Sequence, residues 1–255
     1  MYQLDQISFS RIAAYSGGFG CPAKFKFGYV LGLKARMKGT SLSIGWGVGH
    51  VIAMPTRGRD RLTVWLGEWE DYCHKVWDDI DPEQDREAML EKGRDMLAQA
   101  AIQLPRISAD EMPEYYTERT ICDPDTGEEL PPFVGYLDWY NPKTRVITEL
   151  KTSSRLSHPN NHLMQLALYS HVMSEPDTPV SLTLIQISRA KVPKIRIDDV
   201  TITSNQERWI LRSVADTVHA INANIFPARP SFMCNSCEFR AACQDGDFSG
   251  LVEKG

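Results

Sequence analysis

The sequence predicts an α/β fold in which a mixed β-sheet is flanked by helices. Two observations lead to this expectation. Apolar residues recur at helical spacing from Arg61 to Ala101. Further along, short apolar segments typical of strands, at 133–140, 145–151 and 180–187, are interrupted by an amphipathic helix at 160–174. Strands and helices that alternate along a chain are typical of α/β proteins.

Composition limits the class of protein. The chain has 255 residues, of which 42% are hydrophobic and 24% charged, so it can bury a substantial core. No apolar run is long enough to span a membrane, and the N-terminus, MYQLDQISFS, has no basic or apolar stretch typical of a secretory signal. The expected location is therefore the cytoplasm.

The remaining elements are predicted in chain order. Residues 1–59 form a basic N-terminal region that mixes helix-forming and Gly-rich pieces. Within the helical segment, Asp81-Pro82 predicts the start of a second helix, and the tryptophans at 65, 69 and 77 are expected to pack it. A strand is expected at 115–121 and another at 194–197. A last long helix is expected at 205–224.

The distribution of charge along the chain favours a nucleic-acid partner, although the net charge does not. A net charge of -5 argues against a nucleic-acid partner, but no Asp or Glu lies between Gln6 and Arg59. Local basic patches attract phosphates even on an acidic protein, although chance clustering on a solvated surface would look the same. The candidate DNA-binding residues are Lys24, Lys26, Lys34, Arg36, Lys38, Arg189, Lys191 and Lys194.

Strands 133–140 and 145–151 are expected to form a hairpin around the turn Asn141–Thr144. An even-length loop would place Tyr140 opposite Arg145 and Asp138 opposite Ile147. Because side chains alternate along a strand, Asp138, Glu149 and Lys151 would then share one face of the sheet.

Two carboxylates on one face repel each other unless a cation lies between them. Mg²⁺ or Mn²⁺ would offset that repulsion, because both take hard oxygen ligands. Such a cation, with Lys151 to assist a water molecule or the developing charge, suits phosphodiester hydrolysis. Taken alone, the same three residues also fit a surface salt bridge.

The helix at 160–174 adds two polar side chains, Gln165 and Tyr169. They are four residues apart and therefore lie on one helix face. If that face meets the acidic residues, an amide and a phenol could hold a phosphate or a sugar. Taken singly, each residue also fits an ordinary polar or half-buried position.

These motifs, 135-GYLD-138, 149-ELK-151 and 165-QLALY-169, resemble the PD-(D/E)xK nucleases of the RecB-like branch. Upstream, 45-GWGVGH-50 resembles the Gly-rich segment of that branch, which ends in a histidine ligand. The resemblance implies that His50 joins Asp138 and Glu149 on a metal, and an imidazole ligand would favour Mn²⁺. It also suggests Glu118 as a further acid, with Glu114 as a competitor for that role.

Four of the six cysteines complete the resemblance. Cys234, Cys237 and Cys243 form C-x2-C-x5-C, and 21-CPAKF-25 resembles a segment of the CRISPR-associated RecB-type exonucleases and the AddB nuclease domain. In those proteins, one N-terminal and three C-terminal cysteines bind a [4Fe–4S] cluster, which implies the same for these four. The alternative is a zinc site. Cys73 is expected to be a core thiol and Cys122 a loop thiol.

The resemblance implies a restriction-endonuclease-like mixed sheet, with an iron–sulfur staple between the N- and C-terminal regions. The whole chain, 1–255, is expected to be one nuclease domain: the basic region 1–59, a helical insert 60–112, the core 113–225 and a Cys-rich tail 226–255. The resemblance also implies a metal-dependent exonuclease that degrades single-stranded or frayed DNA with 5′ to 3′ polarity. The alternatives are a DNA-end-binding or trimming subunit of a recombination, repair or CRISPR-adaptation complex, and an RNA-directed nuclease.

Overall fold

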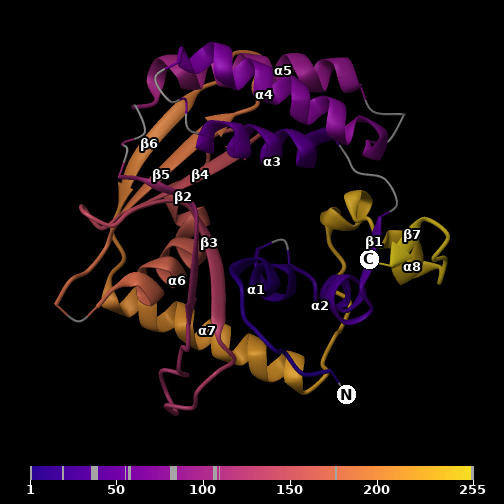
Figure 1. The fold of residues 1–255 in the computed structure, drawn as a ribbon. Coiled ribbons are helices and arrows are strands. Elements are labelled where there is room, and N and C mark those ends of the chain that lie inside the picture. The colour runs from indigo at the N-terminus through magenta and orange to yellow at the C-terminus, as the bar shows by residue number, and fades with distance from the viewer. Residues whose placement is uncertain are drawn as a thin grey trace. The chain divides into compact units, whose positions relative to one another are not determined.

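A computed structural model describes residues 2–18, 20–35, 40–54, 56, 59–80, 85–105, 108, 110–175 and 177–253 of the chain (Figure 1). The chain divides into two compact units, which are described separately. Unit 1 comprises Met1–Arg36, Thr117–Gly135 and Thr203–Gly255, and unit 2 comprises Met37–Tyr116 and Tyr136–Ile202.

A five-stranded mixed sheet carries the motifs, which confirms the predicted fold class. Its strand order is β2-β3-β4-β5-β6, where β3 and β4 are antiparallel, β4 and β5 parallel, and β5 and β6 antiparallel. Helix α6 (Leu163–Met173) makes the crossover that a parallel pair requires. The strands are β2 (Met112–Arg119), β3 (Phe133–Asn141), β4 (Val146–Ser153), β5 (Ser181–Ser188) and β6 (Ile195–Val200).

The hairpin of β3 and β4 differs from the predicted register by two residues. Tyr140 lies opposite Ile147, not Arg145, because the Asn141 side chain accepts hydrogen bonds from the amides of Lys143 and Thr144 and lengthens the turn. The predicted pairing of Asp138 with Ile147 is therefore wrong. A shift of two residues leaves every side chain on its face, so the shared face of Asp138 and Glu149 is confirmed.

Three helices of unit 2 cover one face of the sheet, and α6 covers the other (Figure 1). Helix α4 begins where predicted, after the N-cap Asp60, whereas α5 begins after the N-cap Asp85. The predicted start at Asp81-Pro82 lies outside the described residues. The three helices are α3 (Thr40–Ala53), α4 (Arg61–Val76) and α5 (Arg86–Gln103), and short turns η2 (Trp77–Asp79) and η3 (Pro159–His162) complete the unit.

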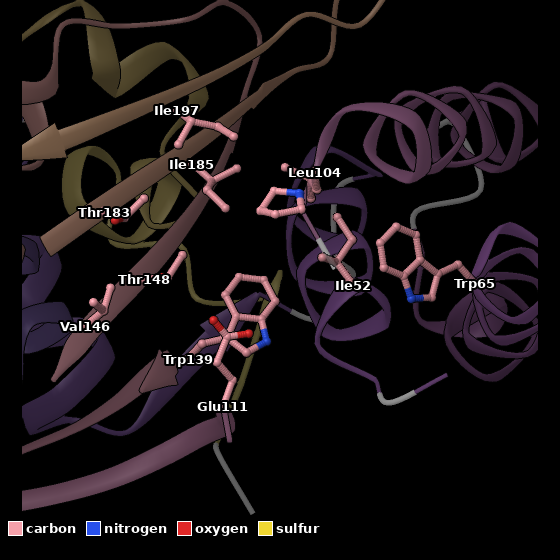
Figure 2. Close-up of a pocket in the computed structure, with 11 residues that line it drawn as sticks. Ile52, Trp65, Leu104, Glu111, Trp139, Val146, Thr148, Thr183, Ile185 and Ile197 are labelled. Carbon is pink, nitrogen blue, oxygen red and sulfur yellow. The ribbon is translucent and has the colours of Figure 1, made fainter. Parts of the chain in front are cut away.

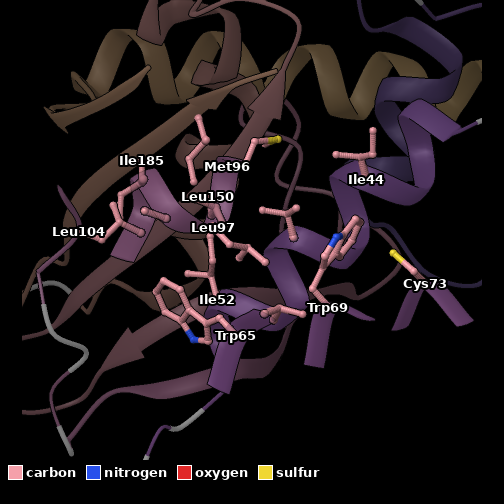
Figure 3. Close-up of a cluster of buried hydrophobic side chains, with 14 of the residues drawn as sticks. Ile44, Ile52, Trp65, Trp69, Cys73, Met96, Leu97, Leu104, Leu150 and Ile185 are labelled. Carbon is pink, nitrogen blue, oxygen red and sulfur yellow. The ribbon is translucent and has the colours of Figure 1, made fainter. Parts of the chain in front are cut away.

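The core of unit 2 lies between the sheet and these three helices (Figure 3). Trp65 and Trp69 of α4 are fully buried in it, which confirms the packing role predicted for them. The Trp69 ring lies so close to Gly93 of α5 that a Cβ there would meet it at 2.1 Å. Leu150 of β4 belongs to the same core, so its neighbours Glu149 and Lys151 point to the opposite face.

Unit 1 combines helices with a two-stranded sheet. Helix α7 begins with a capping box made by Thr203 and Gln206, and its Arg212 pairs with Asp125. Strands β1 and β7 pair antiparallel. The elements are α1 (Phe9–Ser16), α2 (Pro22–Phe25), the π-helical turn η1 (Lys26–Val30), β1 (Leu33–Ala35), α7 (Ser204–Asn222), η4 (Phe232–Ser236), α8 (Arg240–Gln244) and β7 (Leu251–Glu253).

Two further features match the sequence analysis. Cys73 is buried in the core and Cys122 is exposed beside a turn. Among the described helices, none is both long and apolar enough to cross a bilayer.

Candidate active site

Five predicted residues meet on the face of the sheet that α6 covers. Asp138 comes from β3, Glu149 and Lys151 from β4, and Gln165 and Tyr169 from α6. The last paired residues of β3 and β4 on this side of the hairpin are Trp139 and Thr148. Next to them, the amide of Leu150 donates a hydrogen bond of 2.7 Å to Oδ2 of Asp138. The hairpin thus holds the Asp138 carboxylate against β4 next to Glu149.

Glu149 is the centre of the cluster. It is 2% exposed, and its Oε1 accepts hydrogen bonds from Lys151 Nζ and, at 2.7 Å, from Gln165 Nε2. Its other oxygen, Oε2, is buried and has no hydrogen-bond partner among the described residues. A buried carboxylate oxygen without a partner is costly, so this atom marks a place for a ligand.

The two carboxylates are poorly compensated by the protein. Burial raises the pKa of Glu149 from 4.5 to about 8, the Asp138 charge adds to the effect, and Lys151 opposes it. Burial also raises the pKa of Asp138, against the effects of Lys151 and the Leu150 amide. One lysine therefore does not balance two acids in this environment, and a further cation would.

Gln165 and Tyr169 lie on one face of α6, as predicted, but they point inward. Gln165 is 6% and Tyr169 5% exposed. Besides its bond to Glu149, the Gln165 amide donates to the Tyr169 hydroxyl at 3.1 Å, and that hydroxyl donates to the Tyr136 carbonyl at 2.9 Å. Burial raises the pKa of Tyr169, which keeps the phenol protonated as a donor. Both side chains thus fasten α6 to Glu149 and to β3.

His50 lies on α3 and contacts Glu114 of β2, with 3.3 Å between Nδ1 and Oε1. Burial is the main cause of the raised pKa of Asp138, and the Glu114 charge raises it further, so Glu114 lies near Asp138 as well as in contact with His50. The backbone of Glu114 is left-handed, with φ of 47°, an unfavourable conformation for a residue other than glycine. Glu118, the other predicted acid, is exposed and belongs to unit 1.

The described residues contain no group of three His, Cys, Asp or Glu side chains arranged tightly enough to hold a metal ion. The predicted metal ligands His50, Asp138 and Glu149 therefore stay a prediction, and so do the four predicted cluster cysteines. The structure pairs His50 with Glu114, which the sequence suggests only as a competitor of Glu118.

A family model decides the classification of this arrangement. Residues 6–244 match the model of the PD-(D/E)XK nuclease superfamily. The chain belongs to this superfamily. Glu149-Leu150-Lys151, at the centre of the cluster, reads as (D/E)XK in the sequence, and its assignment to that motif stays a prediction.

One solved structure supports the fold of this PD-(D/E)XK nuclease. The crystal structure of a protein named "Putative exonuclease" from Eubacterium rectale is similar with a TM-score of 0.64 and 12% identity, over 95% of this chain and 94% of that one. The crystal structure of SSO0001 has a TM-score of 0.40 to this chain, with 15% identity over 83% of this chain and 87% of that one. None of the curated proteins matches the sequence.

A hydrogen-bond network that begins next to Lys151 was not predicted. Gln186 on β5 lies beside Lys151 in the sheet, is fully buried, and accepts hydrogen bonds of 3.0 Å from the amide and the hydroxyl of Ser157. The same hydroxyl lies 3.0 Å from Nε2 of His162. Burial lowers the pKa of His162, and Lys151 lowers it further. A buried amide within an apolar strand, LTLIQIS, was the only available sequence signal for this network.

The four predicted cluster cysteines all line one cavity of unit 1, with a volume of about 230 Å³. Backbone amides donate to two of the sulfurs at 3.4 Å, from Arg229 to Cys21 and from Ser231 to Cys234. Burial raises the pKa of the Cys237 thiol, and Cys21 is near enough to raise it as well. The cavity thus brings together residues more than two hundred positions apart in sequence.

The predicted DNA-binding residues differ in their surroundings. Lys24 pairs with Glu238, with 3.0 Å between Nζ and Oε2, so its charge is partly compensated. Arg36 and Lys38 lie outside the described residues, and Arg189 is half-buried. The exposed members are Lys26, Lys34, Lys191 and Lys194.

A second cavity, of about 220 Å³, lies in unit 2 (Figure 2). Its lining includes Thr148 of β4, which alternates with Glu149, so the cavity opens on the face opposite to the acidic cluster. Apolar side chains such as Ile52, Trp65 and Ile185 form most of its wall. It is therefore separate from the candidate active site.

Proposed function

We propose that this nuclease is a metal-dependent DNA exonuclease whose centre is Asp138, Glu149 and Lys151. One observation carries the proposal. Glu149 is buried opposite a second carboxylate, touches Lys151, and keeps one oxygen without a partner among the described residues. A structural salt bridge would need neither the second acid nor the unpartnered oxygen.

Mg²⁺ or Mn²⁺ suits these residues. Asp138 and Glu149 would hold the ion through carboxylate oxygens, with His50 or Glu114 as the next candidate ligands. When bound, such an ion supplies a Lewis acid for phosphodiester hydrolysis. The support is the pKa of Glu149, which burial and then the Asp138 charge raise although Lys151 opposes them; a bound cation would stabilise the charged carboxylates.

The protein's own residues have distinct roles in this proposal. Lys151 donates to a non-bridging phosphate oxygen and stabilises the charge that develops there. Gln165 orients Glu149, and Tyr169 holds β3 through the Tyr136 carbonyl. We therefore assign Gln165 and Tyr169 to positioning Glu149, in place of the direct contact with DNA expected from the sequence.

We further propose that Cys21, Cys234, Cys237 and Cys243 hold a [4Fe–4S] cluster. Such clusters take four cysteine thiolates, and the four thiols line one cavity with amide donors to two sulfurs. A tetrahedral zinc site uses the same ligands and is the alternative. Iron, sulfide and zinc analysis of the purified protein separates the two.

The substrate class and polarity rest on the RecB-like resemblance. We propose single-stranded or frayed DNA as the substrate and 5′ to 3′ degradation. The exposed Lys26, Lys34, Lys191 and Lys194 would contact the DNA backbone. A cytoplasmic location, and a partner protein in recombination, repair or CRISPR adaptation, belong to the same proposal.

The test uses DNA labelled separately at its 5′ and 3′ ends, single-stranded and duplex, with RNA as a comparison. Incubation in Mn²⁺, Mg²⁺ and EDTA should show metal-dependent shortening of single strands from the 5′ end. Equal cleavage of RNA would contradict the DNA assignment. Cleavage that appears only after a partner protein is added would favour the trimming-subunit alternative.

A further inference from the structure

Two exposed tyrosines lie beside the acidic cluster in unit 2. Tyr136 precedes Asp138 by two residues on β3, so both side chains emerge on the same face of the sheet. Tyr116 lies on β2, two residues after Glu114. The two tyrosine rings contact each other, with 5.3 Å between centroids and an interplanar angle of 56°.

Tyr116 and Tyr136 are exposed although both lie in the five-stranded sheet. Tyr136 is 65% and Tyr116 47% exposed, whereas Tyr140, two residues beyond Asp138 on the same face, is 5% exposed. Asp138 therefore lies at the border between a covered and an open part of β3. The open part presents the Tyr136 ring on the face of β3 that carries Asp138, and the Tyr116 ring contacts it.

A hydrogen bond from the candidate active site holds the backbone of Tyr136. The Tyr169 hydroxyl donates to the backbone carbonyl of Tyr136 at 2.9 Å, and the same phenol accepts a hydrogen bond from Gln165. Gln165 in turn holds Glu149. A series of hydrogen bonds thus connects the backbone carbonyl of Tyr136 to the carboxylate of Glu149.

Exposed aromatic rings beside a phosphodiesterase site suit one ligand. Nucleobases stack on aromatic side chains irrespective of sequence, and only an unpaired or terminal base has a free face. We propose that Tyr116 and Tyr136 form a base-stacking surface that selects single-stranded DNA and places its phosphate next to Asp138 and Glu149. This inference rests on the proposed nuclease function and adds the residues that determine the substrate.

The experiment measures binding separately from cleavage. A short single strand that carries 2-aminopurine near its end is bound to the Glu149→Gln protein, in which cleavage is expected to be absent. Tyr136→Leu and Tyr116→Leu in this background should each weaken binding roughly tenfold and remove the fluorescence change that reports stacking. Tyr136→Phe, which keeps the ring, should retain both.

Two controls locate the effect. Trp209→Leu removes another exposed aromatic residue, 60% exposed on α7, and should leave binding unchanged. A strand with an abasic site at the stacked position should bind all variants equally weakly. Because the tyrosines are exposed, thermal unfolding should not change.

The outcomes separate the two proposals. If wild-type protein degrades DNA but both leucine variants bind single strands as tightly as the parent, the stacking surface is wrong and the nuclease assignment stands. Equal loss with Trp209→Leu also overturns the surface. If wild-type protein neither binds nor degrades DNA, both proposals fail.

Discussion

Glu149 bears the strongest electrostatic conflict among the site residues, because it is buried next to another acid with a single lysine in contact. Its pKa rises from 4.5 to about 8, so the metal-free folded protein binds a proton there that the unfolded chain releases. The folded state is therefore favoured at low pH and loses stability as pH rises through this range. Asp138 shifts in the same direction.

Glu149→Gln should consequently stabilise the metal-free protein at alkaline pH. Wild-type protein in EDTA should lose up to ~1.4 kcal/mol of unfolding free energy per pH unit between about 4.5 and about 8. The glutamine variant should show a flatter profile. Urea unfolding across this pH range tests it, with the exposed Glu91→Gln as control. Parallel profiles for wild type and Glu149→Gln would contradict the charge conflict.

Gln165 offers a second test at this scale, because it supports Glu149 without facing solvent. Gln165→Leu keeps the bulk and removes the 2.7 Å hydrogen bond to the carboxylate. Loss of such a supporting contact typically lowers metal affinity or activity by about 10- to 100-fold. Calorimetric titration with Mn²⁺ should show this drop, and Gln103→Leu, exposed at the end of α5, should not. Unchanged affinity with lost DNA binding would return Gln165 to the DNA-contacting role.

The packing of helices α4 and α5 in unit 2 requires a glycine where the two helices come close together. Gly93 of α5 faces the Trp69 ring, and a Cβ would lie 2.1 Å from it, whereas Gly67 of α4 has open space around it. Both residues are within helices, where alanine is otherwise favoured over glycine. The two positions therefore predict opposite responses to the same substitution.

Gly93→Ala should destabilise the protein by about 1–3 kcal/mol, because the packed ring cannot move without strain. Gly67→Ala should stabilise it by up to ~1 kcal/mol. Chemical denaturation of both variants measures the pair. Two stabilising substitutions would show that α4 and α5 do not pack as described.

The sequence predicted most elements and the central motif residues, because hydrophobic periodicity and short motifs are local signals. The hairpin register was wrong by two residues, since the Asn141 side chain reshapes the turn. The contact of His50 with Glu114 depends on a left-handed residue in a strand, which no local pattern indicates. The ring pair of Tyr116 and Tyr136 depends on how β2 pairs with β3, which alternation within one strand could not predict.

At the scale of the whole molecule, unit 1 gathers both ends of the chain, and the segments of unit 2 are inserted between its parts. Strands β1 and β7 join the two ends, as in the pair of Lys34 with Val252. The cysteine cavity also brings the two ends together, because Cys21 and Cys234 both line it. A cluster there would close most of the chain into one loop, which restricts the unfolded state.

Cys243→Ser should therefore remove the iron and lower the melting temperature by several degrees, as expected for a loss of ~1–3 kcal/mol in a chain of this size. Cys122→Ser, an exposed cysteine outside the cavity, should change neither. Iron, sulfide and zinc content per chain, measured together with thermal unfolding, checks both. Stoichiometric zinc without iron would establish the alternative metal.

Asp138, Glu149 and Lys151 are proposed as the hydrolytic centre of a metal-dependent nuclease. The most direct measurement is the rate of single-stranded DNA degradation in Mn²⁺ by wild type, Glu149→Ala and Lys151→Ala, each confirmed as folded. We expect degradation by wild type that EDTA abolishes and a loss of at least about 100-fold in both variants. Degradation that persists in either variant, or no degradation by folded, metal-loaded wild type, would contradict it.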